Sequence, residues 1–155
     1  MRTLTPVELR AWRMLLRVHA HVTRQLESEL LADEGMALGT YDVLVQLSES
    51  PGRRLRMTDL AERVLLSRSG LTRLVDRLEK EGLVRREPCP DDARGTFTVL
   101  TDAGQERLAT AAPGHLAGVH EHFTGRFGDS ELETLEALLG RVLEDVPDLT
   151  GRPAR

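Results

Sequence analysis

The stretch from Met57 to Thr101 constrains the fold most, because its apolar residues change from a helical spacing to a strand-like one. A short helix is expected first, and Ser67 is placed to cap a second helix that ends at Gly82. Two β-prone runs follow at 83–87 and 96–100, separated by a segment rich in turn residues. This order predicts two helices joined by a turn and followed by a β-hairpin.

A long helix is expected before this stretch. Thr5, Pro6 and Glu8 form a helix start, because Thr can cap, Pro suits the first helical position and Glu can reach back to the cap. Apolar residues then recur at steps of three and four to about Ala32. Such a helix would be about 40 Å long at 1.5 Å per residue. A domain of this size cannot cover it, so part of its apolar stripe is expected to meet a second chain.

Shorter helices complete the pattern. A break at 35–39 precedes a helix that opens at Thr40 and ends at a turn over 50–52. Thr101 begins another helix, which is expected to bend or break near Pro113, and Asp129 is expected to cap the last one. The chain is therefore predicted to be mainly α with a small β-hairpin wing. This is a winged helix-turn-helix with dimerisation helices at its N- and C-terminal ends.

The same pattern divides the chain into regions. Residues 1–34 and 105–146 are predicted to form a helical dimerisation region. Residues 35–104 are predicted to form the winged helix-turn-helix lobe, and residues 147–155 a frayed tail. Helices at both ends of the chain would then carry the lobe between them.

The distribution of charge matters more than its sum. The net charge is −4, yet residues 53–94 carry 11 Lys and Arg against 8 Asp and Glu, between two acidic flanks. Phosphate binding responds to the local field, so the middle segment remains compatible with nucleic acid. Neither a membrane span nor a signal peptide is predicted, and the single Cys89 fits a reducing compartment. A cytoplasmic protein is expected.

The helix after Ser67 is expected to show one polar face. At 100° per residue its leucines and Val75 gather on one side, while small hydroxyls and arginines gather on the other. Such a face suits a major groove, where Arg pairs with guanine and Ser or Thr contacts bases or phosphates without blocking entry. A solvated amphipathic helix is the alternative. The residues predicted to contact the major groove are Arg68, Ser69, Thr72, Arg73 and Arg77.

Several motifs of this segment together resemble one family. They are the run 56–61, the run 67–84, and the wing segments 91–95 and 99–104. In that order they resemble the MarR family of bacterial transcriptional regulators. The resemblance implies an obligate homodimer whose first, fifth and sixth helices intertwine. It also implies a recognition helix from each subunit in successive major grooves of palindromic double-stranded DNA.

The wing is expected to supply further contacts. The resemblance implies that Arg94 reaches the minor groove and that Asp92 orients it, and the negative potential of a narrow minor groove agrees with this role. A turn-closing role is the alternative for Asp92. Arg85 and Arg86 on the first wing strand are predicted to contact phosphate. Arg53 and Arg54 are weaker candidates, because residues beside a Pro-Gly turn are commonly solvated.

A ligand-binding cleft is also expected. Many relatives of the family bind small aromatic anions between the dimerisation helices and the lobe, and then lose DNA affinity. An aromatic wall with a cation would suit a phenolic carboxylate. The residues proposed to line it are Trp12, Arg17, His19 and Tyr41, with ordinary core or interface positions as the alternative.

Other chemistry finds little support. His115 and His122 are seven residues apart and would share a helix face, but no metal-binding pattern accompanies them, so no metal is expected. Cys89 is read as incidental rather than redox-active. No phosphate loop, nucleophile elbow or catalytic pairing occurs, so neither an enzyme nor a cofactor is expected.

The predicted function is a dimeric DNA-binding regulator, a repressor released by an aromatic anion. A winged-helix protein-interaction module without specific DNA binding is the alternative.

Overall fold

The computed structural model describes residues 3–64, 67–89 and 92–144. The fold is mainly helical with one small sheet, as the sequence predicts. The helices are α1 (Pro6–Glu34), α2 (Leu38–Ser48), α3 (Met57–Arg63), α4 (Arg68–Lys80), α5 (Asp102–His122) and α6 (Asp129–Gly140). The strands are β1 (Arg54–Arg56), β2 (Val84–Cys89) and β3 (Asp92–Leu100), and the 3₁₀ turns are η1 (Pro51–Arg53) and η2 (Thr124–Arg126). The predicted tail at 147–155 lies outside the described residues.

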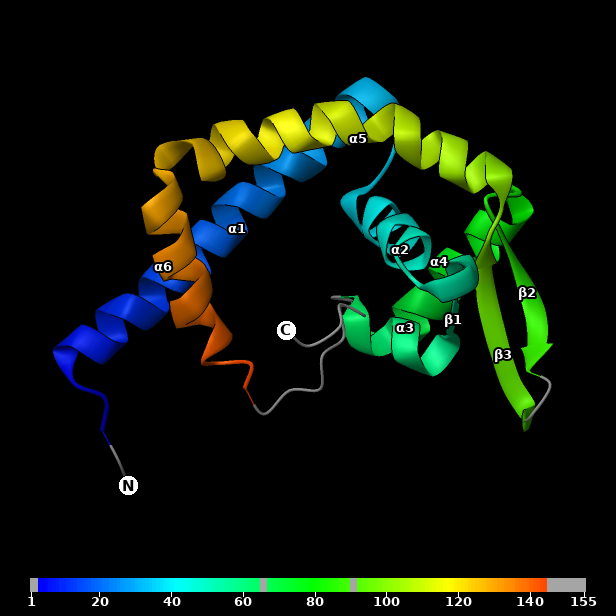
Figure 1. The fold of residues 1–155 in the computed structure, drawn as a ribbon, viewed down its shortest axis with the longest axis horizontal. Coiled ribbons are helices and arrows are strands. Elements are labelled where there is room, and N and C mark those ends of the chain that lie inside the picture. Colours follow the sequence, from blue (N-terminus) through cyan, green and yellow to red (C-terminus); the bar gives the residue numbers. More distant parts are fainter. Residues whose placement is uncertain (1–2, 65–66, 90–91, 145–155) are drawn as a thin grey trace.

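The two longest helices form an arch. α1 and α5 lie side by side along much of their length, and α6 turns back beside the N-terminal half of α1 (Figure 1). The helices α2, α3 and α4 and the sheet form a winged lobe below the N-terminal end of α5 (Figure 1). Among the described residues, no helix is long and apolar enough to cross a membrane.

The sheet has three antiparallel strands in the order β1-β3-β2. The predicted hairpin is confirmed as β2 and β3, while β1 was not foreseen. β1 has only three residues, too few for a recognisable period, and its pairing partner β3 lies about forty positions later in the chain. Leu55 points into the core, and Arg54 and Arg56 lie on the other face of the sheet.

The helix ends confirm some predictions and correct others. Thr5 forms the predicted capping box with Glu8. α2 begins at Leu38 rather than Thr40, because Glu27 of α1 accepts the free N–H of Leu38 at 2.5 Å and so supplies a cap from another helix. The N-cap of α6 is Gly128 rather than Asp129.

α5 is continuous through Pro113, contrary to the predicted interruption. Proline removes one helical hydrogen bond, but packing against α1, one ion pair and one side-chain hydrogen bond compensate for its loss. Arg107 pairs with Glu34 at 2.7 Å near one end of the contact, and His122 pairs with Glu29 at 2.5 Å near the other. α5 and α1 are therefore held together on both sides of Pro113.

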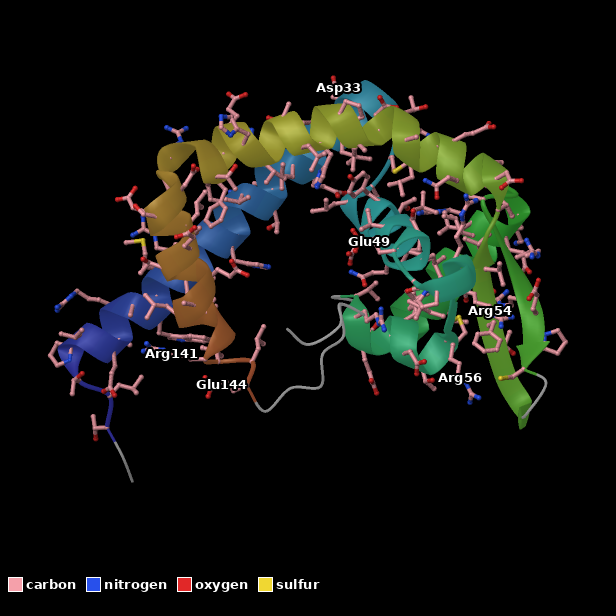
Figure 2. The ribbon with its side chains drawn as sticks, in the orientation of Figure 1. Asp33, Glu49, Arg54, Arg56, Arg141 and Glu144 are labelled. Carbon is pink, nitrogen blue, oxygen red and sulfur yellow. The ribbon has the colours of Figure 1, made fainter. Side chains whose placement is uncertain are left out.

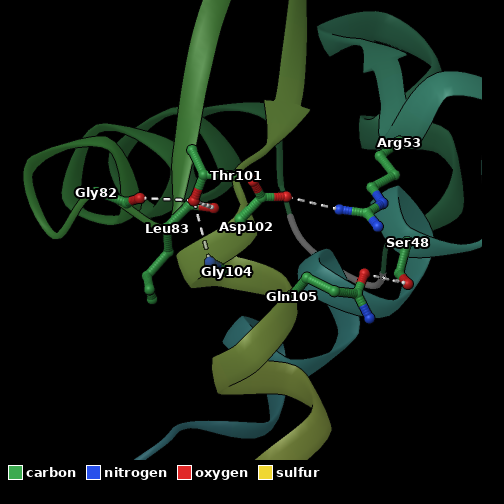
Figure 3. A network of polar contacts seen from close by, with 8 residues as sticks. All are labelled: Ser48, Arg53, Gly82, Leu83, Thr101, Asp102, Gly104 and Gln105. Atoms are coloured by element: carbon green, nitrogen blue, oxygen red, sulfur yellow. Dashed lines mark hydrogen bonds and ion pairs between the residues drawn. The ribbon is translucent and has the colours of Figure 1, made fainter.

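The winged lobe is fastened to the first turn of α5 (Figure 3). The Thr101 hydroxyl accepts from the Gly104 N–H at 3.0 Å and donates to the carbonyl of Gly82 at 2.7 Å. Nearby, Arg53 pairs with Asp102 at 3.1 Å. The hydroxyl of Ser48 donates to Gln105 at 2.9 Å. These contacts join α5 to α2, η1 and the turn before β2, so they fix the orientation of the lobe on the arch.

Candidate nucleic-acid interface and the clefts beside it

The outward face of α4 carries small polar groups and an arginine. Ser67 caps the helix as predicted, accepting the Gly70 N–H at 3.2 Å. The inward Leu71, Val75 and Leu78 are buried in the core, which fixes the rotation of the helix. On the side of α4 away from the core, this rotation exposes Ser69, Thr72 and Arg73. Arg68 begins the helix, but its side chain lies outside the described part of the chain.

Arg77 lies on the flank of α4 that faces α2. Its Nη2 donates to the buried Thr40 hydroxyl at 3.0 Å, and its Nε lies 3.7 Å from Glu81. Thr40 therefore holds the Arg77 guanidinium toward α2, although about half of the Arg77 side chain stays exposed. The helical wheel placed Arg77 at the edge of the polar face but could not show that α2 supplies a partner.

Arg86 ties the wing to α4. Its two terminal nitrogens donate to Asp76 at 2.6 Å and to Glu79 at 2.7 Å, and its backbone N–H donates to Glu79 at 3.1 Å. Partial burial opposes the charged form, but the hydrogen bonds to the two carboxylates outweigh it and raise the pKa of Arg86. Asp76 of α4 is thus paired with a residue of the first wing strand.

Replacing Arg86 with methionine should destabilise the fold by about 1–2 kcal/mol, because two charge-assisted hydrogen bonds between β2 and α4 depend on that side chain and its surroundings are only partly buried. The matched control is Arg85→Met, since Arg85 lies on the same strand and pairs with Glu87 in a more exposed setting. Urea denaturation should show a clear loss for the first variant and almost none for the second. Equal losses would show that Arg86 does not fasten the wing.

Of the remaining predicted wing contacts, the structure describes the side chain of Arg85 but not those of Asp92 and Arg94. Arg85 is exposed and donates to Glu87 at 2.6 Å and 3.0 Å. Asp92 and Arg94 lie in β3, beyond an irregularity in the pairing at Pro88 and Cys89. Their side chains lie outside the described part, so the minor-groove contact remains a prediction.

A cleft of about 950 Å³ opens between α1 and α5 of the arch and α2 and α3 of the winged lobe. It brings together two of the four predicted ligand residues, His19 and Tyr41. Trp12 and Arg17 do not line it, and Trp12 lies instead in a groove between α1 and α6. Trp12 occupies an earlier turn of α1, whereas Arg17, two residues before His19, projects from nearly the opposite side of the helix.

The cleft also contains polar residues that the sequence reasoning missed. His115 of α5 packs against the Tyr41 ring at 4.1 Å between centroids. Two buried nitrogens, His115 Nδ1 and Arg63 Nε, have no hydrogen-bond partner among the described residues. Burial raises the pKa of Asp42. These groups come from three separate helices, so no local motif could have indicated them.

The histidines do not form a metal site. His115 contacts Tyr41, whereas His122 pairs with Glu29, so the two lie in different environments. The described residues contain no group of three potential metal ligands.

His115 should make the protein less stable in mild acid. Burial lowers its pKa below 6.5, so the unfolded chain takes up a proton there that the folded chain resists. The contribution of neutral His115 is full above that value and is lost as pH falls below it. Urea midpoints measured between about pH 7.5 and 5.5 should fall further for the wild type than for His115→Gln. Equal falls would contradict this assignment.

A second, more apolar groove of about 1060 Å³ runs between α1 and α6. Its lining includes Trp12, Leu15, Leu138 and Leu139, each with two fifths or more of its surface exposed. An apolar face of this extent is unusual on the surface of a monomeric protein and indicates an interaction site.

Comparison with known proteins gives a consistent result. A model described as the MarR family matches residues 34–95. An HTH-type transcriptional repressor of Bacillus subtilis, YetL, is 29% identical over 73% of this chain and 67% of its own length. A Bacillus cereus HTH-type transcriptional regulator is 30% identical over 84% of this chain and 85% of its own.

Solved structures are also similar. AbsC, a MarR family transcriptional regulator from Streptomyces coelicolor, is 41% identical with a TM-score of 0.83, covering 94% of this chain and 98% of its own. Sco3205, a MarR family regulator from the same organism solved in complex with DNA, is 40% identical with a TM-score of 0.84, covering 97% and 96%.

Proposed function

Because the chain belongs to the MarR family of transcriptional regulators, we propose that it binds palindromic double-stranded DNA as a homodimer and represses transcription. One observation carries the proposal: Ser69, Thr72 and Arg73 share an exposed face of a helix whose rotation is fixed by buried leucines. The DNA complex of Sco3205 supports DNA as the partner, and the description of YetL as a repressor supports repression.

The proposed contacts follow the exposed face of α4 and the position of the wing; for Arg68, Asp92 and Arg94, whose side chains lie outside the described part, they rest on the family resemblance. The major-groove set is Arg68, Ser69, Thr72 and Arg73, with Arg94 reaching the minor groove, Asp92 orienting it and Arg85 contacting phosphate. Arg77 and Arg86 are proposed to act one step removed from the DNA, because each guanidinium bonds to a different structural element, whereas Arg85 pairs only within its own strand. Arg77 would hold α4 against α2, and Arg86 would hold the wing against α4.

The proposed dimer uses the apolar groove between α1 and α6. A two-fold interface places the same patch on both subunits, and a second copy would cover leucines that one chain leaves exposed. The winged lobes lie at the other end of the arch, so such a dimer would present two copies of α4 (Figure 1). Two recognition helices about one turn of DNA apart would read the two halves of a palindrome.

The proposed effector is a small aromatic acid in the cleft lined by His19, Tyr41 and His115. The unpartnered nitrogens of His115 and Arg63 would bond its carboxylate, and the Tyr41 ring would pack against its aromatic ring. The cleft borders both α1 and α2, so an occupant would alter the position of the lobe on the arch and with it the spacing of the two recognition helices. Titrating hydroxybenzoates against the protein–DNA complex tests this role, with release of DNA expected.

Selecting bound duplexes from a random DNA pool tests the function as a whole. The expected result is an enriched inverted repeat whose affinity falls steeply as salt rises. If no sequence is enriched and all duplexes bind weakly, the protein-interaction module becomes the better account. That alternative draws on the acidic flanks of the chain and on Asp76 in α4.

A further inference from the structure

The outer face of the wing sheet carries a cluster of arginines around one aromatic ring. Strand register places Arg54, Val99 and Arg85 in one row, and Arg56, Phe97 and Glu87 in the next. The intervening row of Leu55, Thr98 and Arg86 points the other way, toward the core and α4. Three guanidinium groups and one carboxylate therefore share the face that points away from α4.

The arginines of this face are positioned by their neighbours. The Arg54 guanidinium carbon lies 4.8 Å from the centre of the Phe97 ring, and that of Arg56 lies 5.8 Å from it, both within the range of cation–π contact. Glu87 lies 2.6 Å from Arg85 and 3.9 Å from Arg54. About half of the side chain of Arg54 and of Arg85 stays exposed. A face held in this way remains open to a ligand and needs little ordering to bind one.

We propose that the outer sheet face, defined by Arg54, Arg56, Arg85 and Phe97, binds the phosphate backbone of DNA that flanks the palindrome. This inference rests on the proposed function and extends the length of DNA that the protein contacts. Arg54 and Arg56 project from β1 at the end of the molecule opposite Arg141 of α6 (Figure 2). In a dimer joined through α1 and α6, this face would look away from the centre of the palindrome.

Charge and spacing favour a DNA backbone as the occupant. Among the described side chains, the face has three arginines and one glutamate, in a chain whose net charge is −4. Two residues along a strand span about 6.6 Å, which is close to two phosphate steps of about 3.4 Å each along the axis of one DNA strand. Phe97 fixes both guanidiniums on one ring, so the pair can meet two nearby phosphates of that strand together.

Binding to two lengths of the selected duplex tests the inference. One duplex ends at the palindrome, and the other extends about one helical turn, about 10 base pairs, on each side. The wild type should bind the longer duplex more tightly, with a salt slope steeper by about 2–4 units for two to four added phosphate contacts in the dimer. Double replacement by Arg54→Gln and Arg56→Gln should remove that difference while leaving affinity for the shorter duplex within about threefold of the wild type.

Two controls sharpen the result. Arg10→Gln with Arg141→Gln removes the same charge from exposed positions in the first turns of α1 and at the end of α6, and this variant should keep the advantage of the longer duplex. Phe97→Leu keeps every charge but removes the ring, and it should lose a measurable part of the advantage. A Phe97→Leu variant with the full advantage would overturn the role given to the ring.

The outcomes separate the inference from the function on which it rests. If the wild type binds both duplexes equally, or the arginine variant keeps the advantage, the inference fails while DNA binding stands. If the arginine variant keeps the advantage but loses binding to polyglutamate, the face is a surface for an acidic protein and the inference also fails. If neither duplex is bound specifically, the proposed function fails and the inference fails with it.

Discussion

Replacing Gly104 with alanine is expected to destabilise the protein by about 3 kcal/mol, the largest single effect we predict for one added methyl group. A Cβ at this position would lie 2.1 Å from the carbonyl oxygen of Leu83 and 2.6 Å from the Leu100 side chain. Neither can withdraw easily. The Leu83 carbonyl accepts the N–H of Thr101 at 3.1 Å, and Leu100 is buried in the core.

The same helix offers a matched control. Gly114 lies in the middle of α5, and a Cβ there would meet no atom within 4 Å. Gly114→Ala should therefore stabilise the protein by about 0.5–1 kcal/mol, because alanine loses less backbone entropy in a helix. Urea unfolding of both variants measures the two effects. Equal midpoints would refute the close approach of α5 to the turn before β2.

Replacing Leu138 with aspartate is expected to separate the proposed dimer into monomers. Leu138 lines the groove between α1 and α6 and is about half exposed in the single chain, so the monomer should tolerate the change. In a two-fold interface the variant would bury a carboxylate from each subunit. An unpaired charge of this kind costs at least about 3 kcal/mol, which weakens association more than a hundredfold.

Sedimentation measures this effect directly, with circular dichroism to show that the helices persist. The control is Leu31→Asp, because Leu31 is similarly exposed on α1 but lies outside the groove. The first variant should be monomeric and should lose affinity for a palindrome, while the second stays dimeric. A dimeric Leu138→Asp protein would place the interface elsewhere.

Local signals in the sequence predicted most of the elements. Ser67 and Thr101 cap α4 and α5 because a hydroxyl at the N-cap satisfies a free N–H three residues later, whatever the rest of the fold does. The wing strands follow from their β-prone runs in the same way. β1 and the cap on α2 escaped prediction because each depends on a distant partner, β3 for the first and Glu27 for the second.

In the candidate sites too, local sequence predicted the features that depend on one helix and missed those that depend on a distant partner. The exposed position of Arg73 could be predicted, because the spacing of apolar residues within one helix shows which face is buried. The partners of Arg77 and Arg86 come from other elements, so a helical wheel could not show that Thr40, Asp76 and Glu79 hold them. The ligand cleft was the hardest to foresee, since α1, α2, α3 and α5 each contribute to it. Trp12 was assigned there on composition alone.

The central claim is that the exposed face of α4 reads base sequence. The most direct test compares the affinity of Arg73→Ala for the selected palindrome and for an unrelated duplex, at one fixed salt concentration, with Arg85→Ala as the control. The claim predicts that Arg73→Ala lowers the ratio of the two affinities by about tenfold or more. Arg85→Ala should weaken binding to both duplexes alike and leave the ratio unchanged. An unchanged ratio for Arg73→Ala would contradict the claim.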